Sequence, residues 1–462
     1  MAALAAGLVW APGGAVSASV LRVCPHGCAF TQIQPALDAA AAGDTVAVGP
    51  GSYAGGIVIT KAVTVSGAGV GAAVISGGGP VITVAAGPVV LRGLTVTGGH
   101  GPGDGGGILN SGTLTVTGVA VRGNTAAFSG GGIASEGTYA PGGPPVSLVL
   151  RGGTITGNTA AGDGGGLFTA GAAAQATVRG TAIRGNTAGS GGGVAAEHSA
   201  AMRLASAVVN ANTGMDSGGV AVLSGASATV SGTTVNHNSA AFTGGIDAYK
   251  ATLRIADSVI NGNTATDPVS GFGGGVATAQ SDVTITGTSI SRNSAADGGG
   301  VEAVKSGVSI TGTAIDRNSA VQGGGVALDT RVSVTLANDV VAGNTASAQG
   351  GGINLGNRAD LTMTGTSVTR NTSGGDGGGM YSEGISASAE LTNDSVNANS
   401  AARDGGGIFD GPESSVMLDS DTSVNRNRAA AGGGIDVASG TAALNGATVL
   451  HNIPDNCQPA IC

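Results

Sequence analysis

The sequence predicts an all-β protein, a single right-handed parallel β-helix (β-solenoid) with a short N-terminal capping helix. One pattern recurs thirteen times between Gly105 and Asn452, at a mean spacing of about 27 residues. It consists of a glycine block closed by an aliphatic residue, a Thr-rich alternating stretch, and then Ile or Val in the order Ile/Val-x-x-Asn. A period of this size is typical of stacked repeats. Because no run between the strands is long and apolar enough for a helix, each strand must pair with its equivalent one turn later.

Residues 1–18 are predicted to be a signal peptide. Residues 2 to 10 are apolar, and Val16-Ser17-Ala18 has the form of a signal-peptidase site, although no Lys or Arg precedes Arg22. We therefore expect export, with an apolar disordered N-terminus as the alternative.

Residues 19–104 are predicted to form a cap and the first coils. Thr31-Gln32-Ile33-Gln34 has the form of a capping box and predicts an amphipathic helix through Ala42. Gly43–Tyr53, which holds a strand and a Pro-Gly turn, and then Ile57–Lys61 follow the helix. A cap is required because the open end of a β-solenoid exposes unpaired strand edges to other chains.

The thirteen repeats occupy residues 105–452, and a central repeat shows their chemistry. Gly298–Val301, Val308–Gly312 and Ile315–Asn318 are short runs separated by Gly and Asn, which tolerate the left-handed backbone of tight corners. They indicate three strands and three turns per coil. Alternation turns the aliphatic residues inward, so each coil covers the apolar layer of the next and an isolated repeat is not expected to fold.

The asparagine at the end of each repeat is predicted to form a structural ladder at one inner corner. An amide side chain has both donors and acceptors, so it can bond to its equivalents in neighbouring coils or to turn backbone groups. A simple turn preference is the alternative. The thirteen residues are Asn124, Asn158, Asn186, Asn212, Asn238, Asn263, Asn293, Asn318, Asn344, Asn371, Asn399, Asn427 and Asn452.

Four cysteines lie near the chain ends, and residues 453–462 are predicted to be a disulfide tail. About sixteen coils at roughly 4.8 Å each make a rod on the order of 75 Å long, so the two N-terminal cysteines cannot reach the C-terminal pair. Local bridges are expected, Cys24 with Cys28 and Cys457 with Cys462. A metal at the first pair is the alternative, but only one histidine lies nearby, and no metal site is predicted.

The composition excludes several partner classes. The formal net charge is −9, with Lys61, Lys250 and Lys305 as the only lysines. Without a basic stripe or an aromatic platform, no nucleic-acid partner is expected. The mature chain is predicted to have one domain, no membrane span and a monomeric state.

The repeat resembles that of the chlamydial polymorphic outer-membrane proteins, which also combine Gly-Gly-aliphatic with aliphatic-x-x-Asn. The chlamydial motif usually has Phe where this chain has Ile or Val. More broadly, the chain resembles secreted right-handed parallel β-helix proteins of the pectate-lyase-like superfamily, and Gly43–Tyr53 with Ile57–Lys61 is similar to the opening coil of many bacterial members. The resemblance covers Gly105–Asn452, roughly three quarters of the chain. It implies the fold and an extracellular or cell-surface location.

Acidic side chains mark one face of the predicted solenoid. Counted from the inward aliphatic residue of each glycine block, odd offsets should face solvent. These positions hold Glu136, Glu197, Asp247, Tyr249, Glu302, Asp329, Asn354, Glu383 and Asp436, with Lys250 and Lys305 at strand ends. Pectate-lyase-like enzymes hold sugar chains in grooves lined in this way. The expected ligand-binding face is therefore Asp247, Tyr249, Lys250, Glu302, Lys305, Asp329 and Glu383, and a solvated acidic surface is the alternative.

The leading functional hypothesis is a non-catalytic, secreted or cell-surface scaffold that binds an extracellular polysaccharide or a surface protein along its length. The runner-up is a polysaccharide lyase or glycosidase at Asp247, Glu302 and Asp329. Asp247 and Glu302 are two coils, about 10 Å, apart, near the upper limit for an inverting glycosidase. Site-specific function must lie where the repeats differ, which includes two long inserts, Glu136–Pro145 and Thr264–Phe272.

Two further alternatives concern calcium and ice. No cofactor is predicted, but aspartates that directly precede glycine blocks could share calcium ions instead of serving as Asp-Gly turns. These are Asp104, Asp163, Asp297, Asp376 and Asp404. A second outward face carries Thr-x-Thr pairs, such as Thr284 with Thr286, and is similar to the arrays of ice-binding β-solenoids. Arg179, Arg254 and other residues interrupt it, and Thr favours exposed strand positions in any case.

Overall fold

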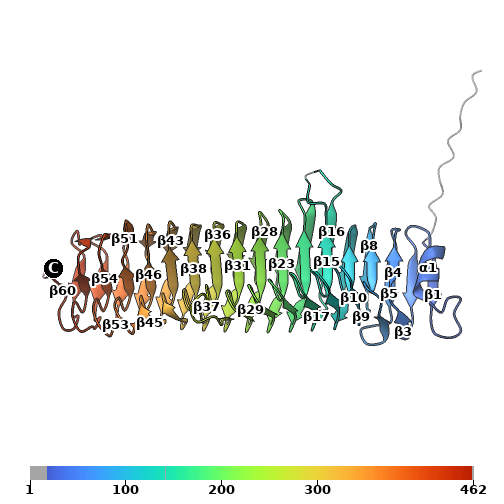
Figure 1. Ribbon diagram of the computed structural model, residues 1–462, viewed down its shortest axis with the longest axis horizontal. Helices are drawn as coiled ribbons and strands as arrows, with labels where there is room; N and C mark the ends of the chain where they lie inside the picture. The colour runs from blue at the N-terminus through green and yellow to red at the C-terminus, as the bar shows by residue number, and fades with distance from the viewer. Residues whose placement is uncertain (1–17, 141, 460–462) are drawn as a thin grey trace, which may run out of the picture.

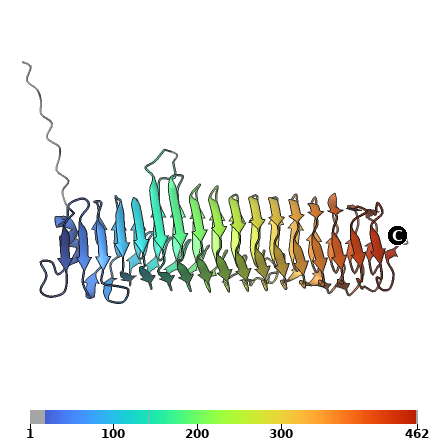
Figure 2. The ribbon, with the colours of Figure 1, turned by 180° about the vertical axis from the view of Figure 1, so that it is seen from behind.

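The computed structural model describes residues 18–140 and 142–459 and shows one parallel β-solenoid of about 17 turns. Figures 1 and 2 show a long rod in which successive coils stack in chain order, with the N-terminal helix at one end and the last strand at the other. The predicted fold class is confirmed. The predicted signal peptide, apart from Ala18, lies outside the described residues.

Three long parallel sheets run along the rod, and we name them after their sequences. The glycine-block sheet has 16 strands, from β4 (Ile57–Ile59) to β60 (Cys457–Gln458). The Thr-x-Thr sheet has 17 strands, from β1 (Val20–Val23) to β58 (Thr441–Ala443). The Asn-side sheet has 16 strands, from β3 (Gly51–Ala54) to β59 (Thr448–Leu450).

A fourth, short strand follows the asparagine corner in many coils. These strands form a seven-stranded sheet from β10 (His100–Gly101) to β34 (Thr264–Ala265) and a four-stranded sheet from β41 (Ser319–Gln322) to β53 (Ser400–Ala401). The expectation of three strands per coil is wrong there. The physical reason is a backbone hydrogen bond at the corner: the carbonyl of each ladder asparagine accepts from the residue directly after the asparagine of the next coil. Asn158 O, for example, accepts from Thr187 N at 2.9 Å. This bond extends the strand pairing past the corner.

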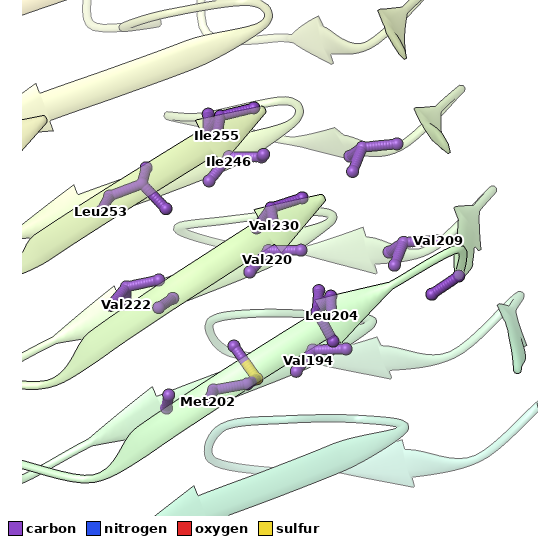
Figure 3. Packing of buried hydrophobic residues seen from close by; sticks show 14 of the residues in the cluster. Val194, Met202, Leu204, Val209, Val220, Val222, Val230, Ile246, Leu253 and Ile255 are labelled. Carbon is purple, nitrogen blue, oxygen red and sulfur yellow. The ribbon is translucent and has the colours of Figure 1, made fainter. Parts of the chain in front are cut away.

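A continuous apolar core fills the rod. In the central coil, β39 (Gly307–Thr311) sets Val308 and Ile310 in register with Val283 and Ile285 of β36 (Asp282–Thr286). All four of these side chains are buried. Figure 3 shows the same stacking a few coils earlier, where the column of Val194, Val220 and Ile246 comes from three successive strands of the glycine-block sheet. Each coil therefore buries the apolar layer of its neighbours.

The N-terminal cap is the helix α1 (Ile33–Ala39), which buries Ile33, Ala36 and Leu37 against the first strands. The predicted helix exists, but the capping box does not. Gln32 is the N-cap and makes no side-chain cap bond, and the helix ends before Ala42 because Ala40 is extended. The Lys61 ammonium closes the C-terminal end by donating to the carbonyls of Asp38 and Ala40, both at 2.8 Å. No helix of the described chain is long and apolar enough to span a membrane.

The predicted Cys24–Cys28 disulfide is confirmed, with a Cα–Cα distance of 5.5 Å. It clamps the loop between β1 and α1. For the predicted Cys457–Cys462 bridge, Cys462 lies outside the described residues.

The ladder asparagines form one buried, hydrogen-bonded column along an inner corner. In the middle of the rod, Asn293 Oδ1 accepts from the backbone N–H of Asn263 at 2.9 Å and from its Nδ2 at 3.0 Å. Asn293 Nδ2 donates in turn to Ile260 O and to Asn318 Oδ1, each at 3.0 Å. The pattern repeats from Asn124 to Asn452, so every coil is joined to the next by the same buried amide.

Candidate functional site

The outward face of the glycine-block sheet is partly covered by the chain itself. The turn before each glycine block folds back over the second residue of the strand. A Cβ on Gly298 would lie 2.7 Å from the Cβ of Glu302, and one on Gly432 would lie 2.6 Å from the Cβ of Asp436. Glu302 is consequently only 3% exposed and Asp436 7%. The expectation that these carboxyl groups face open solvent is wrong, because they point outward but lie under a turn.

A cleft of about 360 Å³ opens in this face near the middle of the rod. Its floor comes from β31 (Ile246–Tyr249), β35 (Val276–Ala279) and β38 (Val301–Val304). The register places Asp247, Ala277 and Glu302 in one column, so the small alanine leaves a hollow between two carboxyl groups. Other lining residues are Asp216, Phe242, Thr243, Phe272, Thr278, Ala279, Val304 and Asp329.

Two phenylalanines form the wall of the cleft. Phe242 and Phe272 stack with ring centroids 6.5 Å apart and planes 18° apart. Phe272 N also donates to Phe242 O at 2.6 Å, which fixes the two turns to each other. Phe272 ends the insert 264–272 and is 41% exposed. Within the insert, Asp267 Oδ1 accepts from the N–H groups of Val269 and Ser270, so this loop has a defined shape.

Burial and mutual repulsion keep protons on the cleft carboxyl groups. Burial raises the pKa of Asp247 to about 7, and the charge of Asp216 adds to the shift. Burial also raises the pKa of Glu302 well above its usual value, followed by the charges of Asp297, Asp329 and Asp247. Glu302 Oε2 is buried and has no hydrogen-bond partner among the described residues. An unpaired buried oxygen costs about 1–3 kcal/mol, and burial of this oxygen without a partner disfavours the charged form of Glu302.

The same pairing of a strand carboxyl with a turn aspartate recurs along the rod. Burial and then Asp163 raise the pKa of Glu197 to about 8, and burial and then Asp104 raise that of Glu136 to about 7. The turn aspartates thus face strand carboxyl groups rather than one another. Within the described ranges, no group of three or more His, Cys, Asp or Glu side chains could hold a metal ion, so the calcium alternative gains no support.

The structure brings some predicted site residues together and separates others. Asp247, Glu302 and Asp329 line the cleft. Tyr249 lines neither this cleft nor the hollow at the adjoining corner, but it pairs with the cleft residue Ala279, and the Lys250 ammonium lies 4.8 Å from the tyrosine ring centroid. Lys250 and Lys305 line a second hollow at the adjoining corner. Glu383 lines neither hollow.

Sequence reasoning missed Asp216 and Phe242, and it did not place Phe272 in the wall of a cleft. The signals that could have found them are the insert itself and the scarcity of aromatic residues, which are only 2% of the chain.

The threonine array on the Thr-x-Thr sheet is short. Thr284, Ser309, Thr335 and Thr362 are in register across four successive coils. Arg254 precedes this row and Glu390 follows it, each at the equivalent position. The row is thus four coils long between two charged side chains, and ice binding stays a prediction.

The raised pKa of Asp247 predicts a pH-dependent effect of Asp247→Asn. Between about pH 4 and pH 7 the folded state holds this proton more tightly than the unfolded chain, so stability falls as the pH rises through that window. We expect Asp247→Asn to raise the free energy of unfolding by about 1–2 kcal/mol at pH 8 and to change little at pH 4. Urea unfolding at both pH values measures this. The exposed Asp282→Asn is the control, and an equal change at both pH values would contradict the prediction.

Neither a protein-family model nor a curated protein matches the chain. Several solved structures superpose loosely on it. The A-module of the mannuronan C-5 epimerase AlgE6 of Azotobacter vinelandii is 17% identical, with 84% of this chain and 93% of that chain covered and a TM-score of 0.31. The catalytic domain of a GH87 α-1,3-glucanase is 10% identical, covering 95% and 71%, with a TM-score of 0.28. The PL6 alginate lyase AlyGC is 9% identical, covering 93% and 100%, with a TM-score of 0.22.

These neighbours are named for action on polysaccharides, but TM-scores this low carry no argument about this chain. The class that the fold and the site define is a parallel β-solenoid with an acidic, phenylalanine-walled cleft on its glycine-block face. Membership of the chlamydial repeat family or of the pectate-lyase-like superfamily stays a prediction.

Proposed function

We propose that this protein is a secreted or cell-surface β-solenoid that binds a glycan chain in the cleft of Asp247, Phe272 and Glu302. The observation that carries the proposal is the cleft of about 360 Å³ lined by Asp247, Phe272 and Glu302, which the repeat alone would not produce. Its volume lies within the usual range of ligand sites, about 300–1,000 Å³. The insert ending at Phe272 supplies the wall that the other coils lack.

The chemistry of the lining suits a sugar ring. Protonated carboxyl groups both donate and accept hydrogen bonds, which matches hydroxyl groups that do the same. The stacked phenylalanines offer an apolar surface for the C–H groups of the ring. Because the raised pKa values of Asp247 and Glu302 remove negative charge near neutral pH, the cleft does not repel a glycan as strongly as its formal charge implies. The Cys24–Cys28 disulfide is consistent with an oxidising, extracellular compartment.

The proposal is tested by measuring binding to a panel of neutral and anionic polysaccharides. We expect Phe272→Ala to weaken binding of the recognised glycan about tenfold, since it removes the exposed ring of the wall. The control is Val269→Ala in the same insert, which is 79% exposed and does not line the cleft. Unchanged affinity of Phe272→Ala would contradict the site, and no binding to any glycan would contradict the function.

Glycoside hydrolysis is the second candidate. It is favoured by the different environments of two carboxyl groups in one cleft, because Glu302 is buried under a turn and Asp329 is exposed at the rim. An inverting glycosidase needs one protonated acid and one carboxylate that activates water. Glu302 suits the first role and Asp329 the second. Release of reducing ends from the bound glycan would favour hydrolysis, and binding without release would favour the scaffold.

A further inference from the structure

A second hollow, of about 450 Å³, lies at the corner where the glycine-block sheet turns into the Thr-x-Thr sheet. Its lining includes Lys250, Gln280 and Lys305, which directly follow the paired residues Tyr249, Ala279 and Val304 in three successive coils. The two lysines are thus about 10 Å apart, two coil spacings, with the glutamine between them. The remaining lysine of the chain, Lys61, is engaged with the carbonyls of the N-terminal cap.

Hydrogen bonds of two serine hydroxyl groups fix the backbone at this corner. Ser281 Oγ donates to Ala248 O at 3.0 Å and to Ala279 O at 2.9 Å. Ser306 Oγ donates to Val304 O at 2.9 Å and accepts from Ser281 N at 3.1 Å. These bonds tie successive coils together, so the backbone that carries the lysines is preorganised.

Neither lysine is neutralised by the protein. The ion pairs of the described residues are His198 with Glu197, Arg317 with Asp316, and Arg403 with Asp376. Asp282 lines the same hollow without reaching ion-pair distance of either ammonium group. Both lysines are exposed, in a chain whose net charge is −9. The Lys250 ammonium lies over the ring of Tyr249, but neither lysine has an acidic partner among the described residues, so the corner carries two uncompensated positive charges.

The corner adjoins the cleft. Ala279 and Val304 line the cleft, and the residues that follow them, Gln280 and Lys305, line the corner. A ligand in the cleft that extends past these two residues reaches the lysines. We infer that Lys250, Gln280 and Lys305 bind the anionic substituents, carboxylate or sulfate, of an acidic glycan whose sugar rings occupy the cleft. This inference rests on the proposed function and names its ligand class.

The test compares matched polymers that differ only in charge. The pairs are dextran sulfate with dextran, and polygalacturonate with its methyl ester. We expect the protein to bind at least one anionic polymer about tenfold more tightly than its neutral partner at low salt. Lys250→Gln combined with Lys305→Gln is expected to abolish this preference without weakening neutral binding, and Lys→Arg at both positions to retain it. Arg179→Gln combined with Arg254→Gln removes two exposed charges from the Thr-x-Thr sheet and is the control for net charge.

The outcomes distinguish failure of the corner site from failure of the glycan-binding cleft. Equal binding of charged and neutral partners, or equal loss in the arginine control, overturns the corner site. Binding of neutral polymers alone overturns the corner site and leaves the cleft standing. Binding of none overturns both. The preference for carboxylate or for sulfate identifies which anionic group the corner accepts.

Discussion

Replacing Asn212 by alanine is expected to lower the free energy of unfolding by about 4 kcal/mol. Asn212 Oδ1 accepts from Asn186 N at 3.0 Å and from Asn186 Nδ2 at 2.9 Å, and its Nδ2 donates to Ile183 O at 3.1 Å and to Asn238 Oδ1 at 2.9 Å. All of these groups are buried. The substitution leaves two donors and one carbonyl without hydrogen-bond partners at a place that water cannot reach. Each unpaired group costs about 1–3 kcal/mol.

The chain offers a matched control two residues away. Asn210 belongs to the same coil, is half-buried, and its side chain makes no hydrogen bond among the described residues. Asn210→Ala is expected to change stability by no more than about 0.5 kcal/mol. Urea unfolding followed by circular dichroism compares the two midpoints. Equal loss in both variants would show that the ladder is only a turn preference.

Gly300→Ala is expected to be at least as damaging, with a loss of about 4 kcal/mol or failure to fold. A Cβ there would lie 2.6 Å from Gly325 O, 2.9 Å from Ile315 Cγ2 and 3.0 Å from Asn318 Nδ2. The backbone cannot move away to relieve this clash, because Gly300 N donates a hydrogen bond to Gly325 O of the next coil at 3.0 Å. The glycine block is thus required by the close approach of neighbouring coils.

Gly312→Ala separates this steric cause from backbone strain. Gly312 has φ +59°, and nothing lies within 4 Å of the Cβ position. The expected loss is therefore only the cost of a left-handed alanine, about 1–2 kcal/mol. Soluble yield and unfolding midpoint of the two variants provide the measurement. A Gly300→Ala protein as stable as Gly312→Ala would refute the steric explanation.

The fold was predictable because each coil is a template for the next. The stacking of Val308 on Val283, and of Ile310 on Ile285, follows from the period and from alternation alone. The one architectural error, three strands per coil, arose because Thr-Ala and Ser-Ala pairs carry no apolar alternation. Their strand conformation depends on bonds to the neighbouring coil, as between Thr187 N and Asn158 O.

The candidate site was predictable only in part. Counting offsets from the glycine block identified Asp247 and Glu302 as outward residues, but offsets say nothing about what lies above them. The burial of Glu302 results from the turn at Gly298, and Phe242 meets Phe272 across 30 residues of sequence. Their approach depends on the path of two turns, for which the repeat provides no rule.

The sequence by itself determined the solenoid, its inward aliphatic columns and the identity of its outward faces, because these follow from periodic, short-range pairing that every coil repeats. Only the tertiary structure decided which outward residues are covered, where a cleft opens and that Lys250 and Lys305 adjoin it. Those features depend on how the turns pack over the sheet, because the turns set the burial of the carboxyl groups beneath them and so raise their pKa values.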